Sequence, residues 1–145
     1  MDQFDIIPAI HTDRPQIVSL LEKEKLPKDD LPAVLENFFV VKDGNNIIGA
    51  IGLEKYEDLG LLRSMVVAPE YRNNRIASQL IQVLEEHAGT LGIEQIFLLT
   101  ETAENYFSKK GYMETARVDV PLRIQTSSEF STLCPISAKV MKKSI

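Results

Sequence analysis

A short polar turn with two arginines, Arg72 and Arg75, stands between an apolar, β-branched run over residues 61–68 and an amphipathic helix. Apolar residues recur after the turn at helical spacing, at Ile76, Ala77, Leu80, Ile81, Leu84, Ala88 and Leu91. The first N–H groups of a helix have no internal partners and lie at the positive end of its dipole, so they bind phosphate well. Strand, basic turn and helix therefore predict an anion-binding site.

The same stretch resembles the acetyl-CoA-binding motif of the GCN5-related N-acetyltransferases (GNATs), whose usual form is Arg/Gln-x-x-Gly-x-Gly/Ala. Arg72 and Ala77 fit this form. The resemblance implies that acetyl-CoA is the cosubstrate, with its pyrophosphate on the backbone of residues 73–78 and its pantetheine arm along residues 65–67. The cofactor-binding residues it implies are Met65, Val66, Val67, Arg72, Asn73, Asn74, Arg75, Ile76, Ala77 and Ser78.

Arg75 stands where the GNAT family normally has glycine, which allows positive φ and close approach of a ligand. In right-handed helical geometry an arginine fits at this position and its head reaches a phosphate; otherwise the side chain fills the site. A plain strand-turn-helix with solvated arginines is the alternative to a binding loop. Asn73 also replaces a common glycine, but asparagine adopts left-handed geometry comparatively easily.

Residues 100–112 resemble the second GNAT motif, Asn-x-x-Ala-x-x-Phe-Tyr-x-x-x-Gly-Phe/Tyr. The positions that fit are Ala103, Gly111 and Tyr112. Thr100 replaces the asparagine, and Phe107 replaces the tyrosine that often protonates the leaving thiolate. Tyr106 is the candidate acid, but its side chain is turned about 100° around the helix, so packing in the core is the alternative. Water can protonate a thiolate whose unperturbed pKa lies near 8.5.

Two charged residues on or beside the central strand are candidates for deprotonating or binding the acceptor. Glu54 is our candidate general base, acting through water; a solvated glutamate at a strand end is the alternative. Arg63 lies two residues before Met65 and is expected to share its face. Arg63 would hold a carboxylate or oxyanion of the acceptor, with Thr100 as a second substrate-binding residue; a structural ion pair is the alternative for Arg63.

Segments within residues 50–142, and most distinctively the tail 130–138, resemble the GNAT branch that is found with arsenic-resistance genes. The single cysteine, Cys134, lies in this tail. It has no histidine nearby and is expected to be an inert small hydrophobe. One thiolate cannot build a multi-thiolate arsenic site, so an arsenical acceptor would have to bear an amine.

Composition narrows the function further. A chain of 145 residues suits one domain over 1–145, and its net charge of −5 argues against nucleic acid as a partner. The start of the chain does not read as a signal peptide, and no apolar run approaches the ~20 residues that span a bilayer. One cysteine fits a reducing cytoplasm. We therefore expect a cytoplasmic protein without membrane contact and without a metal.

The periodicity predicts strands at 4–10, 38–42, 46–54, 61–68, 93–100, 112–118 and 137–142. Helices are predicted from Thr12 or Asp13, over 32–37, from 76 to about 91, and over 102–110. Asp43-Gly44-Asn45 predicts a hairpin turn. The resulting order, βααβββαβαββ, is that of the GNAT fold: an α/β fold of three α/β/α layers, with a mixed, mostly antiparallel sheet. Its fourth and fifth strands form a parallel pair.

These observations predict an acetyl-CoA-dependent N-acetyltransferase acting by direct attack on a small amine, with an amino-acid-like acceptor as one candidate. A second copy of the chain is a further candidate partner. Two alternatives stay open: a non-catalytic acyl-CoA-binding or regulatory protein with the same fold, and a degenerate fold used only for association.

Overall fold

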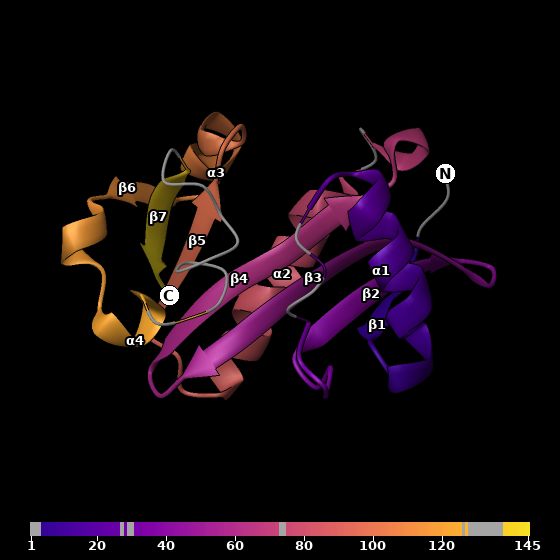
Figure 1. Ribbon diagram of the computed structural model, residues 1–145, viewed down its shortest axis with the longest axis horizontal. Helices are drawn as coiled ribbons and strands as arrows, with labels where there is room; N and C mark the ends of the chain where they lie inside the picture. Colours follow the sequence, from indigo (N-terminus) through magenta and orange to yellow (C-terminus); the bar gives the residue numbers. More distant parts are fainter. Residues whose placement is uncertain (1–3, 27, 29–30, 73–74, 126, 128–137) are drawn as a thin grey trace. The chain divides into compact units, whose positions relative to one another are not determined.

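In the computed structural model, seven strands pair in the order β1-β2-β3-β4-β5-β7-β6 (Figure 1). The structure describes residues 4–26, 28, 31–72, 75–125, 127 and 138–145. Neighbouring strands β1–β2, β2–β3, β5–β7 and β6–β7 are antiparallel, whereas β4 and β5 are parallel. This is the mixed sheet that the sequence predicted. The chain forms two compact units, which are described in turn: the first comprises residues 1–53 and 64–87, the second residues 54–63 and 88–145.

The first unit begins with strand β1 (Ile6–Pro8), which is shorter than predicted, and a 3-10 turn η1 (His11–Asp13). Helix α1 (Arg14–Lys23) follows, with Asp13 at its N-cap as predicted, and Pro15 fits its first turn. Ile17 and Leu21 on this helix are fully buried. A residue just after α1, Lys25, has φ 59°, and Leu26 N donates to Leu21 O. These features end the helix.

The helix predicted over Pro32–Asn37 is wrong, because this stretch forms bends and turns. The Arg14 guanidinium donates to the Pro32 carbonyl, and Phe38 N donates to Leu35 O over 3.1 Å. A helix this short is marginal by itself, so such contacts decide its conformation. The described residues 31–37 therefore do not form the second helix of the predicted order.

Strands β2 (Phe38–Asp43) and β3 (Asn46–Tyr56) form the predicted hairpin through a two-residue turn, with Asp43 opposite Asn46. Gly44 in the turn has φ 62°, which glycine adopts without strain. Strand β4 (Leu59–Val67) follows β3, and a 3-10 turn η2 (Pro69–Tyr71) leads toward helix α2 (Ile76–Thr90). Both β3 and β4 pass from one unit into the other.

The second unit contains strand β5 (Gln95–Thr100), helix α3 (Glu104–Lys109), strand β6 (Met113–Thr115) and strand β7 (Lys139–Ser144). In Figure 1, β5, β7 and β6 lie side by side. A 3-10 turn η3 (Arg117–Asp119) replaces the end of the strand predicted over 112–118. A one-turn helix, α4 (Leu122–Gln125), precedes the tail; residues 128–137, including Cys134, lie outside the described residues.

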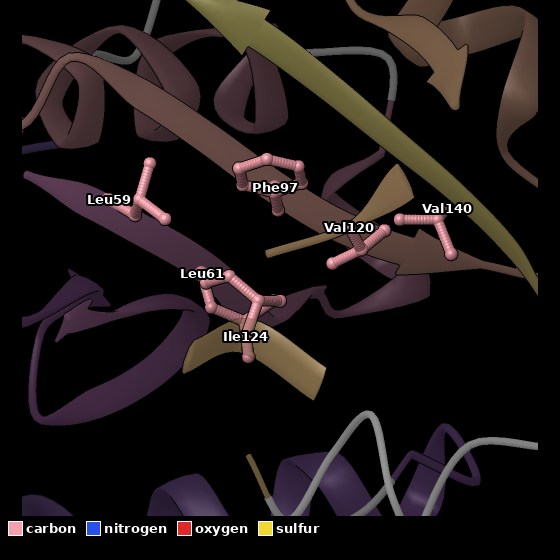
Figure 2. Packing of buried hydrophobic residues seen from close by; sticks show 6 residues of the cluster. All are labelled: Leu59, Leu61, Phe97, Val120, Ile124 and Val140. Carbon is pink, nitrogen blue, oxygen red and sulfur yellow. The ribbon is translucent and has the colours of Figure 1, made fainter. Parts of the chain in front are cut away.

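The core of the second unit joins α4 to the strands. Figure 2 shows six buried side chains gathered there, namely Leu59, Leu61, Phe97, Val120, Ile124 and Val140. Each such side chain stabilises the fold by about 1.5–3 kcal/mol on burial. Tyr56 and Leu99 pack against this cluster.

No helix within the described residues is long and apolar enough to cross a bilayer.

Candidate active site

The turn between β4 and α2 has a backbone that an arginine rarely adopts. Arg75 has φ 61°, and its carbonyl accepts a 3.0 Å hydrogen bond from Gln79 N at the start of α2. Left-handed geometry costs a non-glycine residue about 1–2 kcal/mol. Residue 75 thus has a conformation that suits glycine, and not the right-handed one, while its side chain is exposed. Asn73 and Asn74 lie outside the described residues.

Side chains on either side hold this turn in place. Arg72 Nη2 lies 2.5 Å from Glu24 Oε1 after helix α1, and Arg72 Nε donates to Val67 O over 3.4 Å. The Tyr71 hydroxyl donates to Asp43, which raises the pKa of Tyr71 above its usual 10.0. The charge of Arg72 is therefore shared with Glu24, while its side chain remains about half exposed.

The start of α2 packs closely on the first unit's strands. Ile76 is 2% exposed, and Ile76, Val66 and the strand residue Gly49 meet at one point. A Cβ added at Gly49 would lie 3.3 Å from Val66 O and 3.6 Å from Ile76 Cγ2. The missing side chain therefore lets the helix begin close to the sheet. Of the other predicted cofactor residues, Val67 is buried, and Met65, Ala77 and Ser78 are partly exposed.

Strand β4 departs from regular geometry at Ser64, which has φ 56°. Such a left-handed residue interrupts the alternation of side chains along a strand. We predicted a common face for Arg63 and Met65 from their two-residue spacing. Because Ser64 interrupts the alternation, this spacing does not establish that the two side chains share a face of the strand. The parallel pairing of β4 with β5 runs over Leu59–Leu61 and Gln95–Phe97, before this interruption.

In the second unit, Glu54, Tyr56 and Arg63 form one hydrogen-bonded group. Arg63 Nη1 lies 2.5 Å from Glu54 Oε2, and the Tyr56 hydroxyl donates to Glu54 Oε1. The side chain of Arg63 is 1% exposed and that of Glu54 is 18% exposed. Arg63 therefore forms the ion pair that the sequence left as an alternative, and Glu54 is the member of the pair that reaches solvent.

The second motif of the predicted site lies between β5 and α3. Thr100 Oγ1 accepts a 3.0 Å hydrogen bond from Ala103 N and so closes the turn before α3. Phe107 is 4% exposed, and its ring packs edge-on against Tyr112 at 5.6 Å. Tyr106 is partly exposed, edge-on to Phe107, with Lys110 Nζ 5.4 Å from its ring centre. Phe107 is thus the core residue of this helix, and Tyr106 stands nearer the surface.

Two contacts of the site were missed from the sequence. Tyr56 is two residues from Glu54 on the same strand, so the period of two would have placed it on the same face. Glu24 gave no such signal, because its contact with Arg72 joins segments 48 residues apart. Within the described residues, no group of three or more histidine, cysteine or acidic side chains is arranged to hold a metal ion.

Comparison with known proteins gives the same fold. A family model described as "Acetyltransferase (GNAT) domain" matches residues 35–114. N-acetylglutamate synthase from Neisseria gonorrhoeae, solved with coenzyme A and N-acetyl-glutamate, is similar over 99% of this chain and 35% of its own, with a TM-score of 0.83 and 17% identity. A GNAT-family acetyltransferase from Staphylococcus aureus is similar over 98% and 99% of the two chains, with a TM-score of 0.78 and 21% identity.

Among curated proteins, the amino-acid acetyltransferase of Mannheimia succiniciproducens is 26% identical over 126 residues, which are 81% of this chain and 29% of the relative. The corresponding protein of Photorhabdus laumondii is 26% identical over 100 residues, which are 68% of this chain and 22% of the relative. The chain thus spans between a fifth and a third of the length of these relatives.

Proposed function

The chain belongs to the acetyltransferase (GNAT) family, and from this premise we propose that it transfers the acetyl group of acetyl-CoA to the amine of a small molecule by direct attack. The structural observation that supports this most is that residue 75, directly before helix α2, has a left-handed backbone while its side chain is exposed and does not pack into the turn. Backbone strain persists where the surrounding structure imposes it, and it concentrates at ligand sites. Arginine keeps here the conformation that glycine supplies in the family's motif.

The residues of the first unit suit an anionic coenzyme. The turn offers the positive charge of the exposed Arg75, with Arg72 beside it paired with Glu24 but about half exposed, in a chain with net charge −5. The N-terminus of α2 adds N–H groups without helical partners. We expect the pyrophosphate to bind over residues 72–78, and the pantetheine arm to pair with the backbone of Met65–Val67. When bound, acetyl-CoA supplies a thioester carbonyl for attack by the amine.

We assign proton transfer to residues of the second unit. Glu54 accepts a proton from the amine through a water molecule, so that the nitrogen can form its bond to the acetyl carbon as the C–S bond breaks. The departing thiolate takes a proton from Tyr106 or from water. Arg63 is too deeply buried to hold the acceptor directly as the side chains stand, so we propose that it acts by orienting the Glu54 carboxylate.

An amino-acid-like acceptor is the class that we propose. The curated relatives are named amino-acid acetyltransferases, although they are about 26% identical and much longer. An ammonium group matches the exposed edge of the Glu54 carboxylate. Thr100 is a second candidate contact for the acceptor. We also propose that the chain falls in the branch found with arsenic-resistance genes, on the resemblance of its tail, so the acceptor series should contain an amine-bearing arsenical.

The experiment is an initial-rate measurement of free thiol from acetyl-CoA over a series of amino acids, polyamines and simple amines, with mass spectrometry of the acetylated product. We expect one class to react, and Glu54→Gln to slow the reaction by about 100-fold. Binding of CoA without transfer to any acceptor would instead indicate an acyl-CoA-binding protein. A chain that does not bind CoA would instead indicate the other alternative, a degenerate fold that is used only for association. Cytoplasmic location, a homodimer, and the absence of nucleic-acid and membrane partners stay predictions.

A further inference from the structure

We propose that Tyr56 is a positioning residue for the acetyl transfer, because its hydroxyl orients the carboxylate of Glu54. The proposal rests on the proposed function, in which Glu54 receives the proton of the amine. Tyr56 lies at the end of β3 and does not belong to either sequence motif. Neither motif therefore assigns a role to Tyr56.

The Glu54 carboxylate is held at both of its oxygens. The Tyr56 hydroxyl donates to Oε1, while Arg63 Nη1 lies 2.5 Å from Oε2. Rotation of the carboxylate would break both contacts. Because Arg63 is 1% exposed, the guanidinium cannot follow the carboxylate outward without losing its buried position. The two donors thus fix one orientation of the group.

Tyr56 is itself held from two sides. Its ring packs against the core cluster of the second unit, which includes Leu61 and Ile124. Its carbonyl accepts a 3.2 Å hydrogen bond from Arg123 Nη1, and Arg123 also lies 3.0 Å from Asp58 Oδ1 in the following turn. The hydroxyl therefore donates from a rigid support, which is what orientation of a reacting group requires.

The orientation of the Glu54 carboxylate affects the rate of proton transfer. A general base acts through a water molecule only when its lone pair is aimed at that water, and small displacements reduce the rate strongly. Tyr56→Phe removes the hydroxyl alone and keeps the ring in the core. Loss of this hydrogen bond to the carboxylate should slow the reaction by roughly tenfold.

The test is a double-mutant cycle in the full chain with Tyr56→Phe and Glu54→Gln, using the acceptor that the wild type acetylates. We expect Tyr56→Phe to lower kcat by about tenfold without changing KM for acetyl-CoA. In the Glu54→Gln background the same change should have little effect, because the base is already absent. Arg117→Met, which removes a side-chain hydrogen bond to Ala138 O elsewhere in the second unit, is the control and should leave kcat unchanged.

Thermal unfolding of the four proteins of the cycle without substrates is the second readout. Tyr56→Phe should lower Tm by a few degrees when Glu54 is present and by less in the Glu54→Gln background, since the charge-assisted bond exists only in the first. Equal losses of kcat in both backgrounds, or an unchanged kcat in Tyr56→Phe, would overturn the positioning role. A wild type that binds acetyl-CoA but acetylates no amine would overturn the proposed function itself, whatever the Tm values show.

Discussion

Arg63 and Glu54 form an ion pair in which the cation is the deeply buried partner: the guanidinium is 1% exposed and the carboxylate 18% exposed. Breaking such a pair leaves an uncompensated charge, which costs about 3–5 kcal/mol when that charge is buried. The cost should therefore depend on which partner is removed. Glu54→Ala leaves Arg63 charged in the interior, whereas Arg63→Met leaves a carboxylate that water can reach.

We predict that Glu54→Ala destabilises the chain by about 3–5 kcal/mol and Arg63→Met by clearly less. Urea unfolding, monitored by circular dichroism, gives both free energies, and an unchanged m-value shows that they are comparable. Glu54→Gln removes the charge but keeps the shape of the side chain, so it is the matched control that separates the loss of charge from the loss of packing. A larger loss for Arg63→Met than for Glu54→Ala would contradict the asymmetry.

Arg75 provides a test of backbone strain that needs no ligand. Arg75→Gly and Arg75→Ala both remove the guanidinium, but only glycine relieves the left-handed geometry at φ 61°. We predict that Arg75→Gly is more stable than Arg75→Ala by about 1 kcal/mol, measured as a difference in unfolding free energy. Equal stabilities would show that residue 75 does not hold this conformation in solution.

Gly52 faces the ring of Phe38 on the neighbouring strand, and a Cβ at this position would overlap that ring. Phe38 is 1% exposed, so its ring has little room to move. We predict that Gly52→Ala destabilises the chain by about 1–3 kcal/mol through overpacking. Gly89→Ala, on helix α2 with open space around the added Cβ, is the control and should not destabilise. Similar Tm values for the two variants would contradict this packing.

Asp58 predicts a dependence of stability on pH. The hydrogen bond from Arg123 lowers the pKa of Asp58 below 3.8, so the native state favours the ionised carboxylate. A lowered pKa contributes stability above the unfolded value, and this contribution is lost as the pH falls through the folded value. The stability difference between wild type and Asp58→Asn should be constant near neutral pH and shrink below about pH 4.

Equilibrium unfolding between pH 2.5 and 7 measures this difference for Asp58→Asn. In an Arg123→Met background, which removes the donor, the same substitution should produce a smaller pH-dependent difference. A difference that grows toward acid, or one that Arg123→Met leaves unaltered, would show that the Arg123 contact does not set the pKa of Asp58.

The sequence predicted those elements whose pattern alone determines them. Helix α2 was found because buried residues such as Leu80 and Leu84 recur at helical spacing, and the β2–β3 hairpin because Gly44 permits a tight turn. The stretch 32–37 was mistaken for a helix because its conformation depends on Arg14, a contact that local pattern does not encode. Strand β6 was predicted too long because the chain turns at Arg117.

The sequence indicated which residues belong to the candidate site, but not the contacts that those residues make. Motif resemblance gave the residues of the β4–α2 turn, but the left-handed backbone of Arg75 and the Arg72–Glu24 pair come from the three-dimensional arrangement. The sequence left Arg63 open between substrate binding and an ion pair, because it could not show that the side chain is buried. The roles of all these residues in binding and catalysis stay predictions.

We propose that the start of α2 binds the diphosphate of coenzyme A. Ala77 lies in the first turn of this helix, where a glutamate is compatible with the helix dipole and so should leave the fold intact. The same charge would repel a diphosphate. Isothermal titration calorimetry with acetyl-CoA should show one binding event per chain for the wild type and for Ala77→Gln, and none for Ala77→Glu. Equal affinity of Ala77→Glu and Ala77→Gln, or no binding by the wild type, would contradict the claim.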